Sequence, residues 1–336
     1  MQETEGRIAF RGALRNASRC YPGRDDDRCR DGMLLPEVTP SFAIAASESV
    51  FTIGSCFARN VEDALLRRGL TVPTAGFTAP QEEAPGRPNR ILNQYNPGTM
   101  LQCLTALDTG ETGAGLYDLG EDQVVDCLLA TGSRPVTAAR ALERRAQIRE
   151  LYRSGLEAAG VVVVTLGLVE SWYDREDGLY LNEAPTRRLI NGDNERFTFR
   201  QLGYPECSRM LADMLDRLSD GGRRRVILTV SPVPLRVTFA GGDAVLRNAY
   251  SKAILRAVAE EAARSRADVD YFPSYEMVLS MGLQAFGDDN LHVRPMVVDR
   301  VIAHMVSRYL SPGTTADGSA EDSVEDAARN TEKGAA

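Results

Sequence analysis

Lysine is nearly absent from this chain, because Lys252 and Lys333 are the only two among 336 residues. Arginine supplies almost all of the 39 basic side chains, against 47 acidic ones, and the formal net charge is −8. Codon usage in a GC-rich genome accounts for such a bias. A nucleic-acid-binding protein needs a basic stripe, whereas the arginine run at 223–225 follows two glycines and is typical of a solvated turn. The composition therefore argues against a nucleic-acid partner.

Long hydrophobic runs are also missing. No apolar stretch approaches the roughly 20 residues that a membrane-spanning helix requires, so we expect no membrane partner. Residues 1–6 lack the basic-then-apolar pattern of a secretory signal peptide. These two absences predict a cytoplasmic protein.

Metal-binding patterns are absent as well. The six cysteines form no C-x-x-C pair, and no cysteine lies near a histidine at metal-ligand spacing. We therefore expect free thiols, no metal and no organic cofactor. Histidine is scarce, since His292 and His304 are the only two. A general base that works near neutral pH has few other candidates.

What the chain does contain is an alternation of apolar runs and helical patterns. The run at 161–164 is four valines without polar alternation, as expected of a parallel strand that is buried on both faces. Alternating strands and helices predict a parallel sheet with helices on both faces, an α/β three-layer fold of flavodoxin-like order. The five expected strands are 50–53, 70–73, 161–164, 226–230 and 269–272.

The domain organisation follows from composition. Residues 1–40 are mixed and predict an irregular N-terminal arm that lies on the core. Residues 41–312 form the α/β domain, with insertions near 74–160 and 171–203, the second of which has a hairpin signal at Asp177-Gly178. Residues 313–336 are acidic and almost free of apolar side chains, which predicts a disordered tail.

The most informative motif is Gly54-Ser55-Cys56, where an apolar run meets a helical pattern. A tight strand-to-helix turn exposes a serine Oγ and leaves backbone N–H groups near the helix start for an oxyanion. Ser55 is therefore a candidate nucleophile, although serine is also a favoured N-cap residue. Cys56 is a rival nucleophile because thiolates are intrinsically better, but small buried cysteines are common.

A second motif lies far downstream, at Asp289-Asn290-Leu291-His292. His292 is the candidate general base, and Asp289 can fix its tautomer from three residues away. Asp288 competes for that orienting role, and a surface histidine is the alternative for His292. His304 lies at the edge of an apolar helical stripe and is more typical of a structural histidine. An early serine with a late Asp–His pair suggests a nucleophilic hydrolase or acyltransferase.

Other unusual segments follow the strands, at the carboxyl ends where α/β sheets bind ligands. Glu170 and Trp172 follow the valine strand, and Tyr275 follows the last strand. We assign all three as candidate substrate-binding residues. The alternatives are loop stabilisation for Glu170, packing in the insertion core for Trp172 and capping of the last turn for Tyr275. Lys252 either binds an anionic substrate group or forms an ordinary ion pair.

These ordered motifs resemble the GSCFA family. The resemblance rests on the Gly54–Ala58 segment, Thr165-Leu166-Gly167, Ser231-Pro232-Val233-Pro234, residues 271–276 and the Asp-x-x-His, and it covers roughly residues 36–310. That family in turn resembles SGNH/GDSL-type hydrolases, which implies an SGNH hydrolase-like fold. The same resemblance implies a catalytic triad of Ser55, Asp289 and His292.

The resemblance also implies an oxyanion hole made of the nucleophile's N–H, a glycine N–H and an asparagine side chain. Ser55 supplies the first donor. The expected Gly-x-Asn is replaced by Gly167-Leu168-Val169, so we assign the remaining donors to Asn96 and to Gly98 or Gly167.

The predicted function is a serine-dependent ester hydrolase that acts through an acyl-enzyme. Its expected partner is a small-molecule or glycan acyl ester, with an O-acetyl group as one candidate. Two alternatives remain, an O-acyltransferase with the same triad and a non-catalytic ligand-binding protein that kept the fold. The sequence does not specify an oligomeric state.

Overall fold

The computed structural model describes residues 3–110, 112–130 and 132–310. The expected tail at 313–336 lies outside these residues. The helices are α1 (Gly6–Arg15), α2 (Cys56–Leu66), α3 (Pro97–Thr109), α4 (Ala138–Ala158), α5 (Arg187–Gly192), α6 (Tyr204–Ser219), α7 (Ala244–Ser265), α8 (Ser274–Ser280) and α9 (Pro295–Tyr309). Among the described helices, none is both long and apolar enough to cross a membrane.

The central sheet has four parallel strands in the order β11-β10-β6-β3. These strands are β3 (Ser49–Gly54), β6 (Ala159–Leu166), β10 (Arg225–Val230) and β11 (Val269–Tyr271). The fifth expected strand, at 70–73, is reduced to a parallel bridge between Thr71 and Ser49. Pro73 begins a 3-10 helix there (η1, Pro73–Gly76), which stops the strand. The strands follow the predicted flavodoxin-like order, with the Thr71 bridge beside β3 in the place of the expected strand at 70–73.

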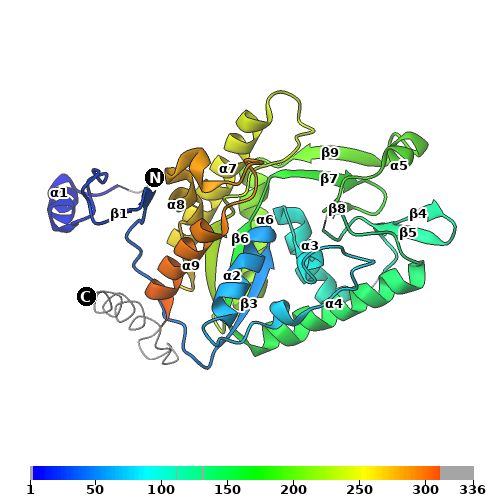
Figure 1. Cartoon of the computed structure of the whole chain (residues 1–336), viewed down its shortest axis with the longest axis horizontal. Helices are drawn as coiled ribbons and strands as arrows, with labels where there is room; N and C mark the ends of the chain where they lie inside the picture. Colours follow the sequence, from blue (N-terminus) through cyan, green and yellow to red (C-terminus); the bar gives the residue numbers. More distant parts are fainter. Residues whose placement is uncertain (1–2, 111, 131, 311–336) are drawn as a thin grey trace, which may run out of the picture.

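Helices cover both faces of this sheet, as Figure 1 shows. Strand β6 contributes side chains to the cores on both faces. Val162 and Val164 belong to the first core cluster, and Val161 and Val163 belong to the second. The first cluster packs against α3, α4, α6 and α7. The second packs against α2, α8 and α9. The three-layer α/β prediction is therefore confirmed.

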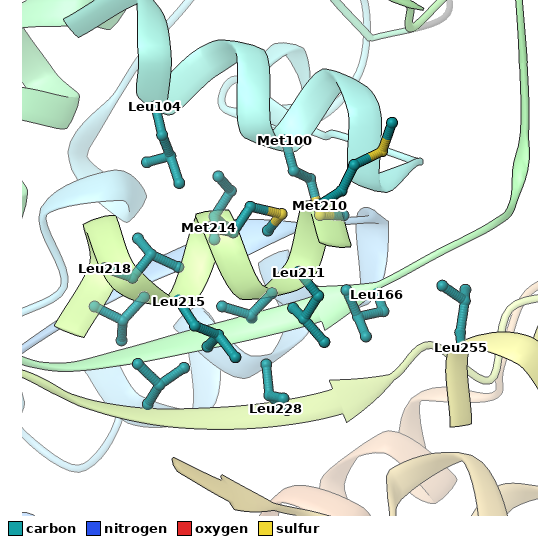
Figure 2. Close-up of a cluster of buried hydrophobic side chains, with 14 of the residues drawn as sticks. Met100, Leu104, Leu166, Met210, Leu211, Met214, Leu215, Leu218, Leu228 and Leu255 are labelled. Atoms are coloured by element: carbon teal, nitrogen blue, oxygen red, sulfur yellow. The ribbon is translucent and has the colours of Figure 1, made fainter. Parts of the chain in front are cut away.

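Figure 2 shows why α6 sits firmly on the first face. Its apolar stripe, Met210, Leu211, Met214, Leu215 and Leu218, follows helical spacing and is buried. Met100 and Leu104 of α3 approach this stripe from one side, and Leu228 of β10 lies on the sheet side. This packing places the start of α3 beside the carboxyl end of the sheet.

The two insertions carry strands of their own. A hairpin joins β4 (Leu116–Gly120) to β5 (Gln123–Asp126), and a second, antiparallel sheet has the order β8-β7-β9. Its strands are β7 (Glu170–Asp174), β8 (Leu179–Leu181) and β9 (Phe197–Gln201). The predicted hairpin at Asp177-Gly178 joins β7 to β8. Figure 1 shows these pieces together at the end of the molecule opposite α1.

The N-terminal arm differs from its prediction. It contains α1, which has no buried residue and stands away from the sheet in Figure 1. A short ladder of β1 (Cys29–Arg30) and β2 (Met33–Leu34) follows, and only from Met33 onward does the arm bury side chains in the core. The expectation of an irregular arm that lies on the core is therefore wrong for residues 6–15.

Candidate active site

The turn that carries Ser55 joins the end of β3 to the start of α2. Gly54 has φ of +141°, and a Cβ at this position would lie 2.3 Å from the Thr165 carbonyl oxygen. Only glycine fits both this conformation and this close approach. The Gly54 carbonyl accepts a hydrogen bond of 2.8 Å from the Gln94 N–H. The turn is thus held between β6 and the segment that precedes α3.

The hydroxyl of Ser55 makes no hydrogen bond within the part of the chain that the structure describes. Ser55 occupies the N-cap position of α2, but its side chain makes no capping hydrogen bond. The residue is 3% exposed, and Oγ has no hydrogen-bond partner among the described residues. A buried hydroxyl without a partner costs about 1–3 kcal/mol. Helix capping therefore does not explain why a serine stands here.

The Asp-x-x-His motif forms its predicted pair. His292 Nδ1 lies 2.5 Å from Asp289 Oδ2, while Asp289 Oδ1 accepts from the N–H groups of Leu291 and His292. These hydrogen bonds, those from the two N–H groups and that from the imidazole, hold the pKa of Asp289 well below its usual value. An ionised Asp289 keeps the proton on Nδ1, so Nε2 is the nitrogen that can accept one.

Asp288 and His304 do not share this arrangement. Asp288 is fully exposed and lies 4.0 Å from Arg294. His304 is 9% exposed in α9, with Nε2 at 3.0 Å from the Pro36 carbonyl oxygen. Burial lowers the pKa of His304, which suits a histidine that packs the arm against α9.

The structure does not bring His292 onto Ser55. The His292 side chain is 78% exposed, on the loop between α8 and α9, whereas Ser55 is buried. Because Ser55 Oγ lacks a hydrogen-bond partner among the described residues, Nε2 is outside hydrogen-bonding distance. Catalytic hydrogen bonds are often long or unformed in unliganded enzymes and tighten in the substrate complex.

The candidate oxyanion donors have other partners. The Ser55 N–H donates to the Thr165 carbonyl at 3.2 Å. Asn96 Oδ1 accepts from the Thr99 N–H at 3.0 Å and so caps α3. A Cβ on Gly98 would lie 2.4 Å from the Tyr180 ring, and one on Gly167 would lie 2.5 Å from the Tyr95 carbonyl oxygen. Both glycines thus permit close packing around the end of β6.

Lys252 is fully buried in α7, at the carboxyl edge of the sheet. Its ammonium donates to the carbonyl oxygens of Gly167 and Val233, both at 2.8 Å. Burial lowers the pKa of Lys252 to about 7, and the nearby Cys56 opposes that shift. Among the described residues Lys252 has no carboxylate partner within ion-pair distance. Lys252 therefore ties together the loops that follow β6 and β10.

Cys56 is poorly suited to act as a nucleophile. Burial raises the pKa of its thiol, and this effect outweighs the opposing effects of Lys252 and of the first N–H groups of α2. Reactive cysteines have a lowered pKa, whereas the pKa of Cys56 is raised although the residue is partly exposed.

The candidate substrate-binding residues lie in different surroundings. Glu170 accepts from the Thr238 hydroxyl at 2.7 Å and from the Phe239 N–H at 3.2 Å, so it holds the loop before α7. The Trp172 ring packs edge-to-face against Phe239 at 5.2 Å. Tyr275 is half-buried on α8 and packs against the first core cluster. Loop stabilisation accounts for the contacts of Glu170.

Two residues of the site region have no motif that could have revealed them. Gln94 contacts the serine turn through its N–H. Asn182, on the insertion, accepts from the Tyr95 N–H at 2.9 Å and donates to the Asn93 carbonyl at 2.7 Å. It therefore fixes the strap of residues 93–96 beside the site. A spacing of almost ninety residues leaves no local signal for such a contact.

Within the described part of the chain, no group of three or more His, Cys, Asp or Glu side chains could hold a metal ion. The fold, together with the site at the carboxyl ends of the sheet strands, defines an α/β protein with a buried serine on a strand-to-helix turn. The chain belongs to the GSCFA family, whose model matches residues 49–305. A comparison with curated proteins gives no match.

Proposed function

We propose that this protein is an SGNH-like serine esterase or acyltransferase that works through an acyl-enzyme on Ser55. The observation that carries the proposal is the buried Ser55 Oγ, which neither caps α2 nor bonds to another described residue. Unsatisfied buried polar groups call for an explanation, and reactive function is a common one. The Asp289–His292 pair supplies a base whose tautomer is already fixed.

The proposed reaction has two steps. Ser55 Oγ attacks the carbonyl carbon of an ester while its proton passes to His292 Nε2. The tetrahedral intermediate then collapses, the bond to the alcohol oxygen breaks, and the leaving alcohol takes the proton from Nε2. Water, or an acceptor alcohol, repeats the sequence on the acyl-enzyme and regenerates Ser55. The step requires Nε2 to approach Oγ to about 2.6–3.2 Å.

The oxyanion donors are also part of the proposal. We assign this role to the Ser55 N–H together with Asn96 and Gly98 or Gly167. The Asn96 amide nitrogen is the relevant atom, because its oxygen caps α3. For this role the Ser55 N–H would have to turn away from the Thr165 carbonyl, to which it donates at 3.2 Å. Glu170, Trp172 and Tyr275 stay proposals for substrate contacts.

Labelling with a fluorophosphonate, mapped by peptide mass spectrometry, tests the proposal. We expect an adduct on Ser55 in the wild-type protein and in Cys56→Ala, none in Ser55→Ala, and labelling slowed about 10²–10⁴-fold in His292→Ala. His304→Gln is the matched control, because it changes the other histidine and keeps a donor toward Pro36. An adduct that forms equally fast without His292 would exclude the triad.

A ligand-binding protein without catalysis is the second candidate. Its support is the separation of His292 from Ser55 together with the engaged Ser55 N–H. Absence of any adduct on folded wild-type protein would favour it. We also propose that the physiological substrate is a small-molecule or glycan ester and that the protein acts in the cytoplasm.

A further inference from the structure

A cavity of about 240 Å³ lies between α3 and α4, on the first face of the sheet. Its walls are mainly apolar and include Leu92, Leu107, Leu128, Leu129, Ile148 and Tyr152. An apolar cavity of about 150 Å³ is already large enough to bind benzene. This cavity therefore has room for a somewhat larger molecule. Polar side chains, Gln94, Gln102, Arg145 and Arg149 among them, make up the smaller part of the lining.

The amide of Gln94, a polar side chain in the wall, has a partner on one side only. Gln94 is 3% exposed and lines the cavity. Its Nε2 faces the Leu128 carbonyl at 3.4 Å, which fixes the orientation of the amide. Its Oε1 is buried and has no hydrogen-bond partner among the described residues. A buried amide oxygen in an apolar wall calls for a donor from a ligand.

We infer that this cavity is a binding site for a small apolar alcohol, whose O–H donates to Gln94 Oε1 while its hydrocarbon body fills the space between α3 and α4. Hydrocarbons, ethers and esters offer no donor. A carboxylate offers none either, and its charge would face the Gln94 oxygen. Arg145 and Arg149, which line the cavity, have partners of their own. A single hydroxyl on an aliphatic body meets both requirements.

The place of Gln94 links this site to the serine turn. Its backbone N–H bonds to the Gly54 carbonyl at 2.8 Å, one residue before Ser55. The polar end of the cavity therefore lies at the carboxyl end of β3. If the proposed acyl transfer on Ser55 holds, and only then, the bound alcohol is the leaving or accepting component of the ester.

Calorimetric titration with 1-hexanol tests the site, with methyl pentyl ether as the size-matched ligand that has no donor. We expect wild-type protein and Ser55→Ala to bind 1-hexanol equally well, and the ether about three- to tenfold more weakly, the ratio expected for one hydrogen bond. Gln94→Met should make the two ligands bind alike. Because Ser55→Ala lacks the proposed nucleophile, binding is measured independently of catalysis.

A substitution that fills the cavity tests whether 1-hexanol binds there. Ala106 lines the cavity on α3, so Ala106→Phe should abolish 1-hexanol binding. Ala139→Phe, the same change at an exposed position of α4, should not. Alkylation of Cys103, a cavity-lining thiol, should slow at least fivefold with 1-hexanol, whereas alkylation of the exposed Cys20 should not.

Circular dichroism checks that each variant is folded. The inference is overturned if wild-type protein does not bind 1-hexanol, if the ether binds as tightly, or if Ala106→Phe binds while folded. Failure of fluorophosphonate labelling with intact 1-hexanol binding would refute the proposed catalysis and leave the alcohol site standing.

Discussion

At the residue scale, Lys252 shows how this fold uses its one lysine inside the described region. A fully buried ammonium is held by two carbonyl oxygens and by no carboxylate, so burial lowers its pKa to about 7. The unfolded chain keeps an ordinary lysine pKa near 10.4. Between these two values the unfolded state binds more protons than the folded state, so the free energy of unfolding rises with pH.

We therefore expect the free energy of unfolding to gain about 1.5 kcal/mol from Lys252 between pH 7 and pH 8.5. Lys252→Met should lack this gain. Urea denaturation of both proteins at the two pH values measures it, and the upper value stays below the range where thiols ionise fully. Equal pH dependence in the two proteins would show that Lys252 is not titrating in this window.

Single residues also show how much of the candidate site can be predicted from the sequence. Asp289 and His292 are three residues apart, and a short loop can bring them together in only a few ways, so the pair was predictable. The exposure of His292 and the hydrogen bond from the Ser55 N–H to Thr165 were not. They depend on contacts between segments more than a hundred residues apart.

At the element scale, α2 is anchored by buried charge beneath the serine turn. Glu62 is fully buried, pairs with Arg59 at 2.7 Å, and accepts hydrogen bonds from Thr52, Thr74 and Asn89. Removal of one partner from such a pair leaves an uncompensated buried charge, whereas removal of both can be much less costly.

We expect Arg59→Met to lower the free energy of unfolding by about 3–5 kcal/mol. The double variant Arg59→Met/Glu62→Leu should lose less than the sum of the two single losses by at least about 1 kcal/mol. The exposed pair of Arg67 and Asp299 at 2.9 Å is the control, and Arg67→Met should cost less than about 1 kcal/mol. Additive losses at Arg59 and Glu62 would contradict the coupling.

Elements of the α/β core were predictable because each had a strong local pattern. The four valines of β6 and the stripe of α6 are examples. The β4–β5 hairpin and β9 were missed, since Leu116–Gly120 and Phe197–Gln201 are short and their partners lie elsewhere in the insertions. α8 was missed because Pro273, directly before its first residue Ser274, is also typical of a loop.

At the scale of the whole molecule, α1 and the segment that begins at Met33 differ in how much apolar surface they bury. In α1 every side chain is exposed, including Ile8 at 59% and Phe10 at 70%. Burial of apolar surface supplies most of the free energy of folding, so α1 contributes little of it. Met33, only eighteen residues after the end of α1, is fully buried in the second core cluster.

Deletion of residues 1–16 should therefore change the free energy of unfolding by less than about 1 kcal/mol, within the range of surface changes. Met33→Ala should lower it by about 2–5 kcal/mol, because it opens a cavity in the core. Chemical denaturation of both variants against the full chain makes the comparison. A deletion as costly as Met33→Ala would mean that α1 packs against the folded body in solution. Equal stability of the deletion and the full chain would place the start of the cooperative unit between α1 and Met33.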